Sequence, residues 1–76
     1  MTDRIETVVI DDEWLRVTTS TGRRVAAPLR FLSERLVYAT AAQRANYRVM
    51  GGGQGLNWPD CDEDVSLEGL LRDFES

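Results

Sequence analysis

The spacing of hydrophobic residues changes at Pro28, and this change divides the chain into two structural patterns. Before Pro28 the chain holds three short strand-like runs: the first is rich in β-branched residues, the second alternates apolar and polar residues, and Pro28 ends the third. The runs are residues 5–10, 14–19 and 23–27. Polar turns at 11–13 and 20–22 separate them and are long enough only for hairpins. The first 28 residues therefore predict a three-stranded antiparallel meander.

After Pro28 the apolar residues take the three- and four-residue spacing of a helix. One helical face would carry Leu29, Leu32, Leu36 and Ala39. Thr40 and Gln43 then match a capping box, so we expect a second short helix to begin at Ala41.

Two short strand-like runs, 47–50 and 56–58, flank the glycine-rich segment 51–55 and predict a hairpin. Pro59 ends the second of these strands. Ser66 has the position of an N-cap for a last helix. The apolar side of that helix would be Leu67, Leu70, Leu71 and Phe74.

Together these elements predict one α+β domain over residues 1–76, with a meander, two short helices, a glycine-loop hairpin and a C-terminal helix. We expect a core of Leu15, Val17, Leu32, Leu36, Trp58, Leu70 and Leu71. Such a small core leaves a net stability of only about 3–5 kcal/mol. Of the two tryptophans, Trp58 is expected inside and Trp14 at an interface.

The cellular setting is predicted from the cysteine content and the N-terminus. Cys61 is the only cysteine, so the chain has no intrachain disulfide and suits a reducing cytosol. Residues 1–6 are polar rather than a signal peptide, and no run approaches the ~20 apolar residues of a membrane helix. We expect a cytoplasmic protein with no membrane partner.

Charge is distributed unevenly along the chain, whose net charge is −4. Residues 1–50 hold eight arginines and six acidic residues, whereas residues 51–76 hold Arg72 and seven acidic residues. Phosphate contacts supply most nucleic-acid affinity, so direct nucleic-acid binding is disfavoured and a basic protein surface is the expected partner. The predicted partner-binding residues, expected to form one negative lobe, are Asp60, Asp62, Glu63, Asp64, Glu68, Asp73 and Glu75, with Asp11, Asp12, Glu13 and Trp14.

Neither catalysis nor a bound cofactor or metal is predicted. The chain has no histidine and no lysine, and four acidic neighbours make Cys61 a poor nucleophile. Residues 51–55 lack the lysine and hydroxyl of a phosphate loop. Residues 60–64 resemble the opening of a calcium loop, but Val65 stands where such loops need glycine and Leu71 where they need glutamate.

The segment 58–71 carries a specific pattern, W-P-x-x-D-E-D-hydrophobic-S-hydrophobic-x-G-L-L. With residues 25–29, residues 40–47 and the glycine loop, it resembles a bacterial and phage family named domain of unknown function 2442. The resemblance spans nearly the whole chain and implies a small α+β domain with a meander, two or three helices and no known catalytic activity. Cys61 departs from the aliphatic residue expected at its position.

Three functions remain open at this point. The family resemblance implies proximity to small toxin-like proteins, which suggests the antitoxin of a toxin–antitoxin pair. An acidic free-standing copy also resembles, in size and charge, phage-borne inhibitors such as anti-CRISPR proteins, which occupy a basic nucleic-acid-binding site by mimicry. The third is a small nucleic-acid-binding regulator. Mimicry requires the acidic residues, an antitoxin requires an apolar patch, and a regulator requires the arginines; we favour the inhibitor.

Overall fold

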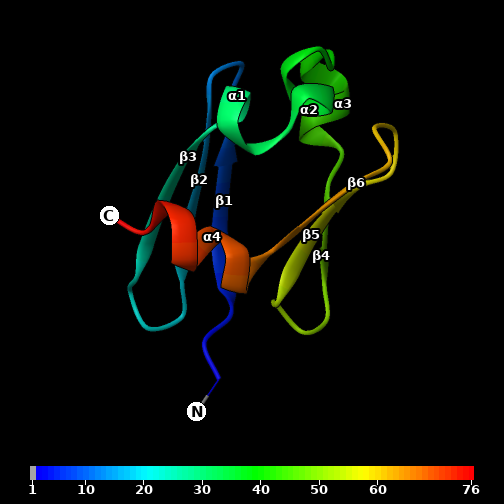
Figure 1. The fold of residues 1–76 in the computed structure, drawn as a ribbon. Helices are drawn as coiled ribbons and strands as arrows, with labels where there is room; N and C mark the ends of the chain where they lie inside the picture. The colour runs from blue at the N-terminus through cyan, green and yellow to red at the C-terminus, as the bar shows by residue number, and fades with distance from the viewer. Residues whose placement is uncertain (1) are drawn as a thin grey trace.

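A computed structural model describes residues 2–76 and shows an α+β fold built on two three-stranded antiparallel sheets (Figure 1). In chain order the elements are β1 (Ile5–Ile10), β2 (Trp14–Thr19), β3 (Arg24–Pro28), α1 (Leu29–Leu32), α2 (Glu34–Val37), α3 (Ala41–Ala45), β4 (Arg48–Met50), β5 (Gly55–Trp58), β6 (Glu63–Ser66) and α4 (Leu67–Phe74). The first sheet has the order β1-β2-β3 and the second β4-β5-β6. Helix α4 packs against β3.

Strand β1 contains one extra residue, Glu6, in its pairing with β2. Ile5 is opposite Thr19, but from Thr7 onward the register is shifted by one. The bulge changes which residues face inward. Those that pack in or against the core are Ile5, Val8 and Ile10. Val9, by contrast, is 54% exposed.

One hydrophobic core collects side chains from both sheets and from α1, α2 and α4. Its fully buried members include Leu15, Leu29, Leu36, Leu56, Trp58, Leu67 and Leu70. The predicted core is confirmed except that Leu32 and Leu71 are only half-buried against it. Trp58 is completely buried and its indole Nε1 donates to the carbonyl of Arg44 at 2.9 Å. A buried indole N–H needs such an acceptor.

The helix predicted after Pro28 is broken at Ser33, so the single helical face was wrong. Ser33 has extended backbone angles, and its Oγ accepts a hydrogen bond from the amide of Leu36 as the N-cap of α2. The same hydroxyl donates to Glu63 at 2.7 Å. Capping and this long-range contact together separate α1 from α2. The next helix begins at Ala41 with a complete capping box, as predicted.

The glycine turn packs against the beginning of β1. The predicted hairpin is confirmed, and Gly51, Gly52 and Gly53 all have positive φ. A Cβ on Gly53 would lie 2.5 Å from the Cβ of Arg4, so only glycine fits there. The amide of Ile5 donates to the carbonyl of Gly53 at 2.8 Å. The turn thereby joins the second sheet to the first.

Strand β6 was missed by the sequence analysis. It pairs with β5 so that Val65 is opposite Leu56, although acidic residues of its kind are depleted in strands. The third strand also differs from the prediction by one residue at each end: it begins at Arg24 and ends at Pro28, which is tolerated because this strand lies at the edge of the sheet.

No helix within residues 2–76 is long and apolar enough to cross a membrane.

Candidate functional site

Two acidic turns that are distant in the sequence lie at the same end of the molecule. Figure 1 shows the β1–β2 turn and the β5–β6 turn, with α1, α2 and α3 between them, at the end opposite the N-terminus. We call this surface the acidic end. Its members are Asp11, Asp12, Glu13, Asp60, Asp62, Glu63 and Asp64. The acidic end also contains cations, since Arg30, Arg35 and Arg44 belong to the helical segment.

Asp62 occupies the tip of the β5–β6 turn. Its φ is +49°, a left-handed conformation that aspartate tolerates better than most residues, and its side chain is fully exposed. The guanidinium of Arg35 donates to the backbone carbonyl of Asp62 at 2.6 Å. The two side chains are 3.9 Å apart and exposed, so their ion pair contributes little. Arg35 therefore holds the backbone of the turn, and the carboxylate points to solvent.

The three acidic residues beside Asp62 are held by uncharged donors. The donor–acceptor pairs are Asn46 with Asp60 at 3.0 Å, Asn57 with Asp64 at 2.5 Å, and Ser33 with Glu63 at 2.7 Å. An amide or hydroxyl orients a carboxylate without cancelling its charge. The turn thus presents three carboxylates that are held in place by neutral partners.

Residues 60–64 use their carboxylates differently from a calcium loop. Asp60 and Asp64 accept hydrogen bonds from side chains on other elements. Within the described part of the chain no three His, Cys, Asp or Glu side chains come together as a group that could hold a metal ion. The expectation that the chain binds no metal stays a prediction. The test is that millimolar calcium leaves the melting temperature unchanged.

Asp11 shapes the β1–β2 turn. Its Oδ1 accepts hydrogen bonds from the backbone amides of Glu13 at 2.8 Å and Trp14 at 2.7 Å. These bonds lower the pKa of Asp11 below its ordinary value, with Arg16 adding a smaller effect in the same direction. Asp11 is therefore a turn-forming residue, and Asp12 and Glu13 are the exposed residues that the turn presents.

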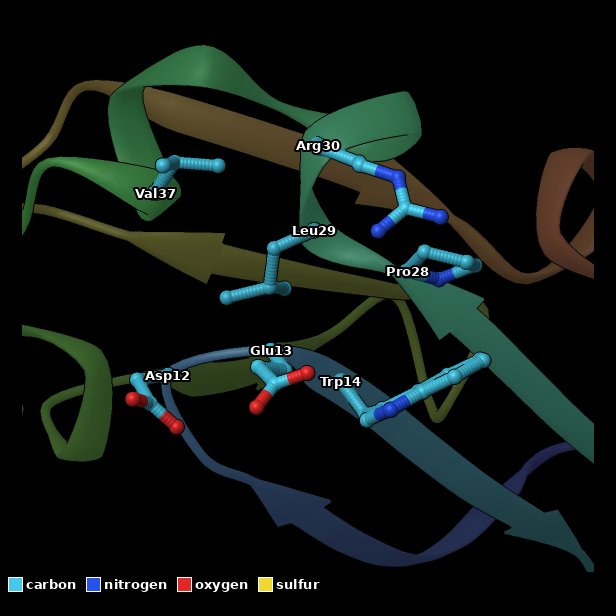
Figure 2. Close-up of a pocket in the computed structure, with 7 residues that line it drawn as sticks. All are labelled: Asp12, Glu13, Trp14, Pro28, Leu29, Arg30 and Val37. Carbon is cyan, nitrogen blue, oxygen red and sulfur yellow. The ribbon is translucent and has the colours of Figure 1, made fainter.

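Trp14 lines a hollow of about 140 Å³ next to this turn (Figure 2). The apolar walls of the hollow are Pro28, Leu29 and Val37, and its rim carries Asp12, Glu13 and Arg30. The guanidinium of Arg16 lies 5.2 Å from the centroid of the Trp14 ring and covers it. Small-molecule sites usually measure about 300–1,000 Å³, so this hollow suits one side chain. We call it the Trp14 hollow.

The remaining acidic residues of the predicted surface, Glu68, Asp73 and Glu75, lie on α4 or directly after it. Glu75 accepts a hydrogen bond from Nε of Arg23 at 2.8 Å, which lowers the pKa of Glu75 and raises that of Arg23. Asp73 is 3.2 Å from its neighbour Arg72. The structure therefore divides the predicted residues between the acidic end and a partly neutralised group on α4.

Sequence analysis missed the residues that support the acidic end. Ser33 and Arg35 reach the β5–β6 turn from a helical segment 25 or more positions away, so no local pattern marks them. Of the walls of the Trp14 hollow, the sequence analysis placed Leu29 on a helical face and Pro28 at the end of a strand, and it assigned no role to Val37. Tertiary packing places them beside Trp14.

Comparison with known proteins identifies a family. Residues 5–76 match the model of a family described as protein of unknown function (DUF2442). Neither the search of curated proteins nor the search of solved structures found a match.

Proposed function

The chain belongs to the DUF2442 family, and we propose that it is a non-enzymatic cytoplasmic domain that binds a basic surface of another protein through its acidic end. In concrete terms it would inhibit a host protein by occupying a nucleic-acid-binding site, as anti-CRISPR proteins do. The observation that carries this proposal is the β5–β6 turn. Three carboxylates there are oriented by neutral donors. Arg35 donates to a backbone carbonyl of the turn and lies 3.9 Å from the exposed carboxylate of Asp62.

Such a surface acts through its summed field rather than through single ion pairs. An exposed ion pair contributes about 0–1 kcal/mol, and screening limits the field to about 8 Å in physiological salt. Fixed charges of one sign nevertheless accelerate the encounter with a positively charged groove and discriminate against acidic partners. We therefore expect the acidic end to affect mainly the association rate, and its effect to weaken with salt.

The test neutralises the turn while preserving its shape. The triple variant Asp60→Asn, Asp62→Asn, Asp64→Asn removes three charges, and asparagine tolerates the left-handed backbone at position 62. The matched control is Glu6→Gln, Glu68→Gln, Asp73→Asn, which changes the net charge equally away from the acidic end. With a fluorescent octa-arginine peptide as the basic probe, we expect at least tenfold weaker binding for the first triple and less than twofold for the control.

Equal losses in both triples would contradict the proposal, because net charge alone would then explain binding. Unchanged circular dichroism in both variants is the control for folding. With a purified nucleic-acid-handling enzyme in place of the peptide, inhibition should disappear in the first triple only.

The Trp14 hollow favours a second candidate, the antitoxin. Its walls are apolar, and Trp14 is a residue type that often supplies binding energy at interfaces. An antitoxin would bind its toxin in high salt, would lose binding on Trp14→Ala, and would keep it in the triple variant of the β5–β6 turn. That pattern would replace the first proposal.

A further inference from the structure

The Trp14 hollow combines an apolar interior with a rim that is anionic on the side of the β1–β2 turn. Leu29, at its base, is 1% exposed, so the interior is part of the packed protein. The carboxylates of Asp12 and Glu13 stand at one side of the hollow in Figure 2, both on the β1–β2 turn. A side chain lying across the hollow would touch hydrocarbon along its length and negative charge at the side formed by the β1–β2 turn.

The backbone under the rim is fixed. The carbonyl of Glu13 accepts a hydrogen bond from the amide of Leu29 at 2.8 Å, and the amide of Glu13 donates to the carboxylate of Asp11. The turn is thus tied both to itself and to the beginning of α1. Exposed side chains on a fixed backbone keep a defined position relative to the hollow, which lowers the entropy lost on binding.

The two rim carboxylates have no cation in the ion pairs formed among residues 2–76. Asp11, on the same turn, is the residue that faces Arg16. Arg30 also borders the hollow, but its guanidinium lies over the ring of Phe31 at 4.8 Å. Figure 2 shows it on the Pro28 side, across Leu29 from the two carboxylates. Negative charge at the rim is therefore available to an incoming cation.

These features fit an arginine side chain, whose aliphatic stem packs on apolar surface while its planar guanidinium pairs with carboxylates. A purely apolar side chain would leave the rim without a partner, and an acidic one would be repelled. We propose that the Trp14 hollow is the anchor site for one arginine of the basic partner protein. This inference rests on the proposed function and adds the site where that partner is held.

The two surfaces would then have separate roles. Exposed charge at the β5–β6 turn governs the rate of encounter, whereas a side chain seated in a hollow governs the dissociation rate. Interfaces commonly depend on a few such central contacts. We expect Asp12 and Glu13 to act at the second step.

The experiment uses n-butylguanidinium as a probe for the side chain and n-butylurea as its uncharged match. In a ¹⁵N-labelled protein, the indole N–H of Trp14 reports on the hollow. That of Trp58, fully buried, is the internal control. We expect n-butylguanidinium to shift the Trp14 signal saturably and to leave Trp58 unmoved. The variant Asp12→Asn, Glu13→Gln should bind it at least fivefold more weakly, and Asp62→Asn should bind it normally.

Three results would overturn the inference. An equal shift with n-butylurea would show that the hollow binds apolar groups without regard to charge. The absence of a saturable shift would show that the hollow is not a binding site. Undiminished binding in the Asp12→Asn, Glu13→Gln variant would show that the rim carboxylates do not hold the guanidinium. Both substitutions are at exposed positions, so an unchanged remainder of the spectrum verifies the fold. Failure of the proposed function looks different: octa-arginine binding would survive the β5–β6 triple variant whatever n-butylguanidinium does.

Discussion

The two sheets of this molecule are specified in different ways. The first sheet has strands of six, six and five residues, and its own alternating side chains fill the core beneath it. The second has strands of three, four and four residues, and β4 is exposed along its whole length. Only Leu56 and Trp58 of the second sheet are fully buried. Local pattern therefore determines the first sheet, and contacts with the rest of the molecule determine the second.

Those contacts are few and identifiable. All three are hydrogen bonds. The indole N–H of Trp58 donates to the carbonyl of Arg44, and the amide of Ile5 donates to the carbonyl of Gly53. The hydroxyl of Ser33 donates to the carboxylate of Glu63. Because the β5–β6 turn belongs to the second sheet, the acidic end depends on the same contacts. Breaking them separately tests whether the second sheet is as dependent as its geometry indicates.

The largest effect is expected from Trp58→Ala. Removing a completely buried tryptophan costs about 3–5 kcal/mol, which is comparable to the whole stability of a domain this small. We expect the variant to be unfolded at 37 °C in urea titrations followed by circular dichroism. The control Trp14→Ala, at a half-buried position, should lose less. Loss of the second sheet alone, with a folded first sheet, would show that the two are separable.

Gly53→Ala should have the next largest effect. A left-handed backbone costs a non-glycine residue about 1–2 kcal/mol, and the clash with Arg4 adds about 1–3 kcal/mol. Gly52→Ala is the matched control, because its φ is also positive but its Cβ would meet nothing within 4 Å. Equal melting temperatures for the two variants would mean that the turn does not press on β1.

The same contrast explains what the sequence could predict. β-Branched content, alternation and the flanking turn residues located β1, β2 and β3 to within one residue, and the capping box located α3. Strand β6 was not predictable, because Glu63 and Asp64 are poor strand formers whose pairing depends on the adjacent strand β5. The break at Ser33 also depends on a distant contact, because the Ser33 hydroxyl donates a hydrogen bond to Glu63, 30 positions away.

For the candidate site, the sequence predicted which kinds of residue take part, but it did not predict which of them lie together in the fold. The acidic residues are evident in the sequence. In the structure, however, Glu68, Asp73 and Glu75 lie on α4 or directly after it, whereas the β1–β2 and β5–β6 turns lie together at the acidic end. Burial identified Trp14 as the less enclosed tryptophan, as its position opposite the Leu15–Val17 face had indicated. The walls of its hollow are Pro28, Leu29 and Val37. The fold brings them next to Trp14, and no spacing pattern in the sequence predicts that contact.

The smallest effect concerns Asp3, which links the two sheets. Its carboxylate accepts hydrogen bonds from the hydroxyls of Ser20 and Thr21 at 2.8 Å, on the turn of the first sheet. Its backbone carbonyl accepts from the side chain of Gln54 in the glycine turn. Desolvation acts to raise the pKa of Asp3, but the hydroxyl and amide hydrogen bonds from the β2–β3 turn outweigh it and lower the pKa well below the ordinary value.

A pKa that is lower in the folded state than in the unfolded chain stabilises the fold wherever the carboxylate is ionised. The contribution of Asp3 is therefore complete above the unfolded pKa of about 3.9 and is lost as the pH falls through the folded value. We expect Asp3→Asn to melt below the wild type at pH 7, and the difference in melting temperature to shrink steadily from pH 5 to pH 2. Ser20→Ala should reproduce the effect in part. If the difference in melting temperature between Asp3→Asn and wild type stays constant from pH 5 to pH 2, the charge of Asp3 does not help to link the sheets.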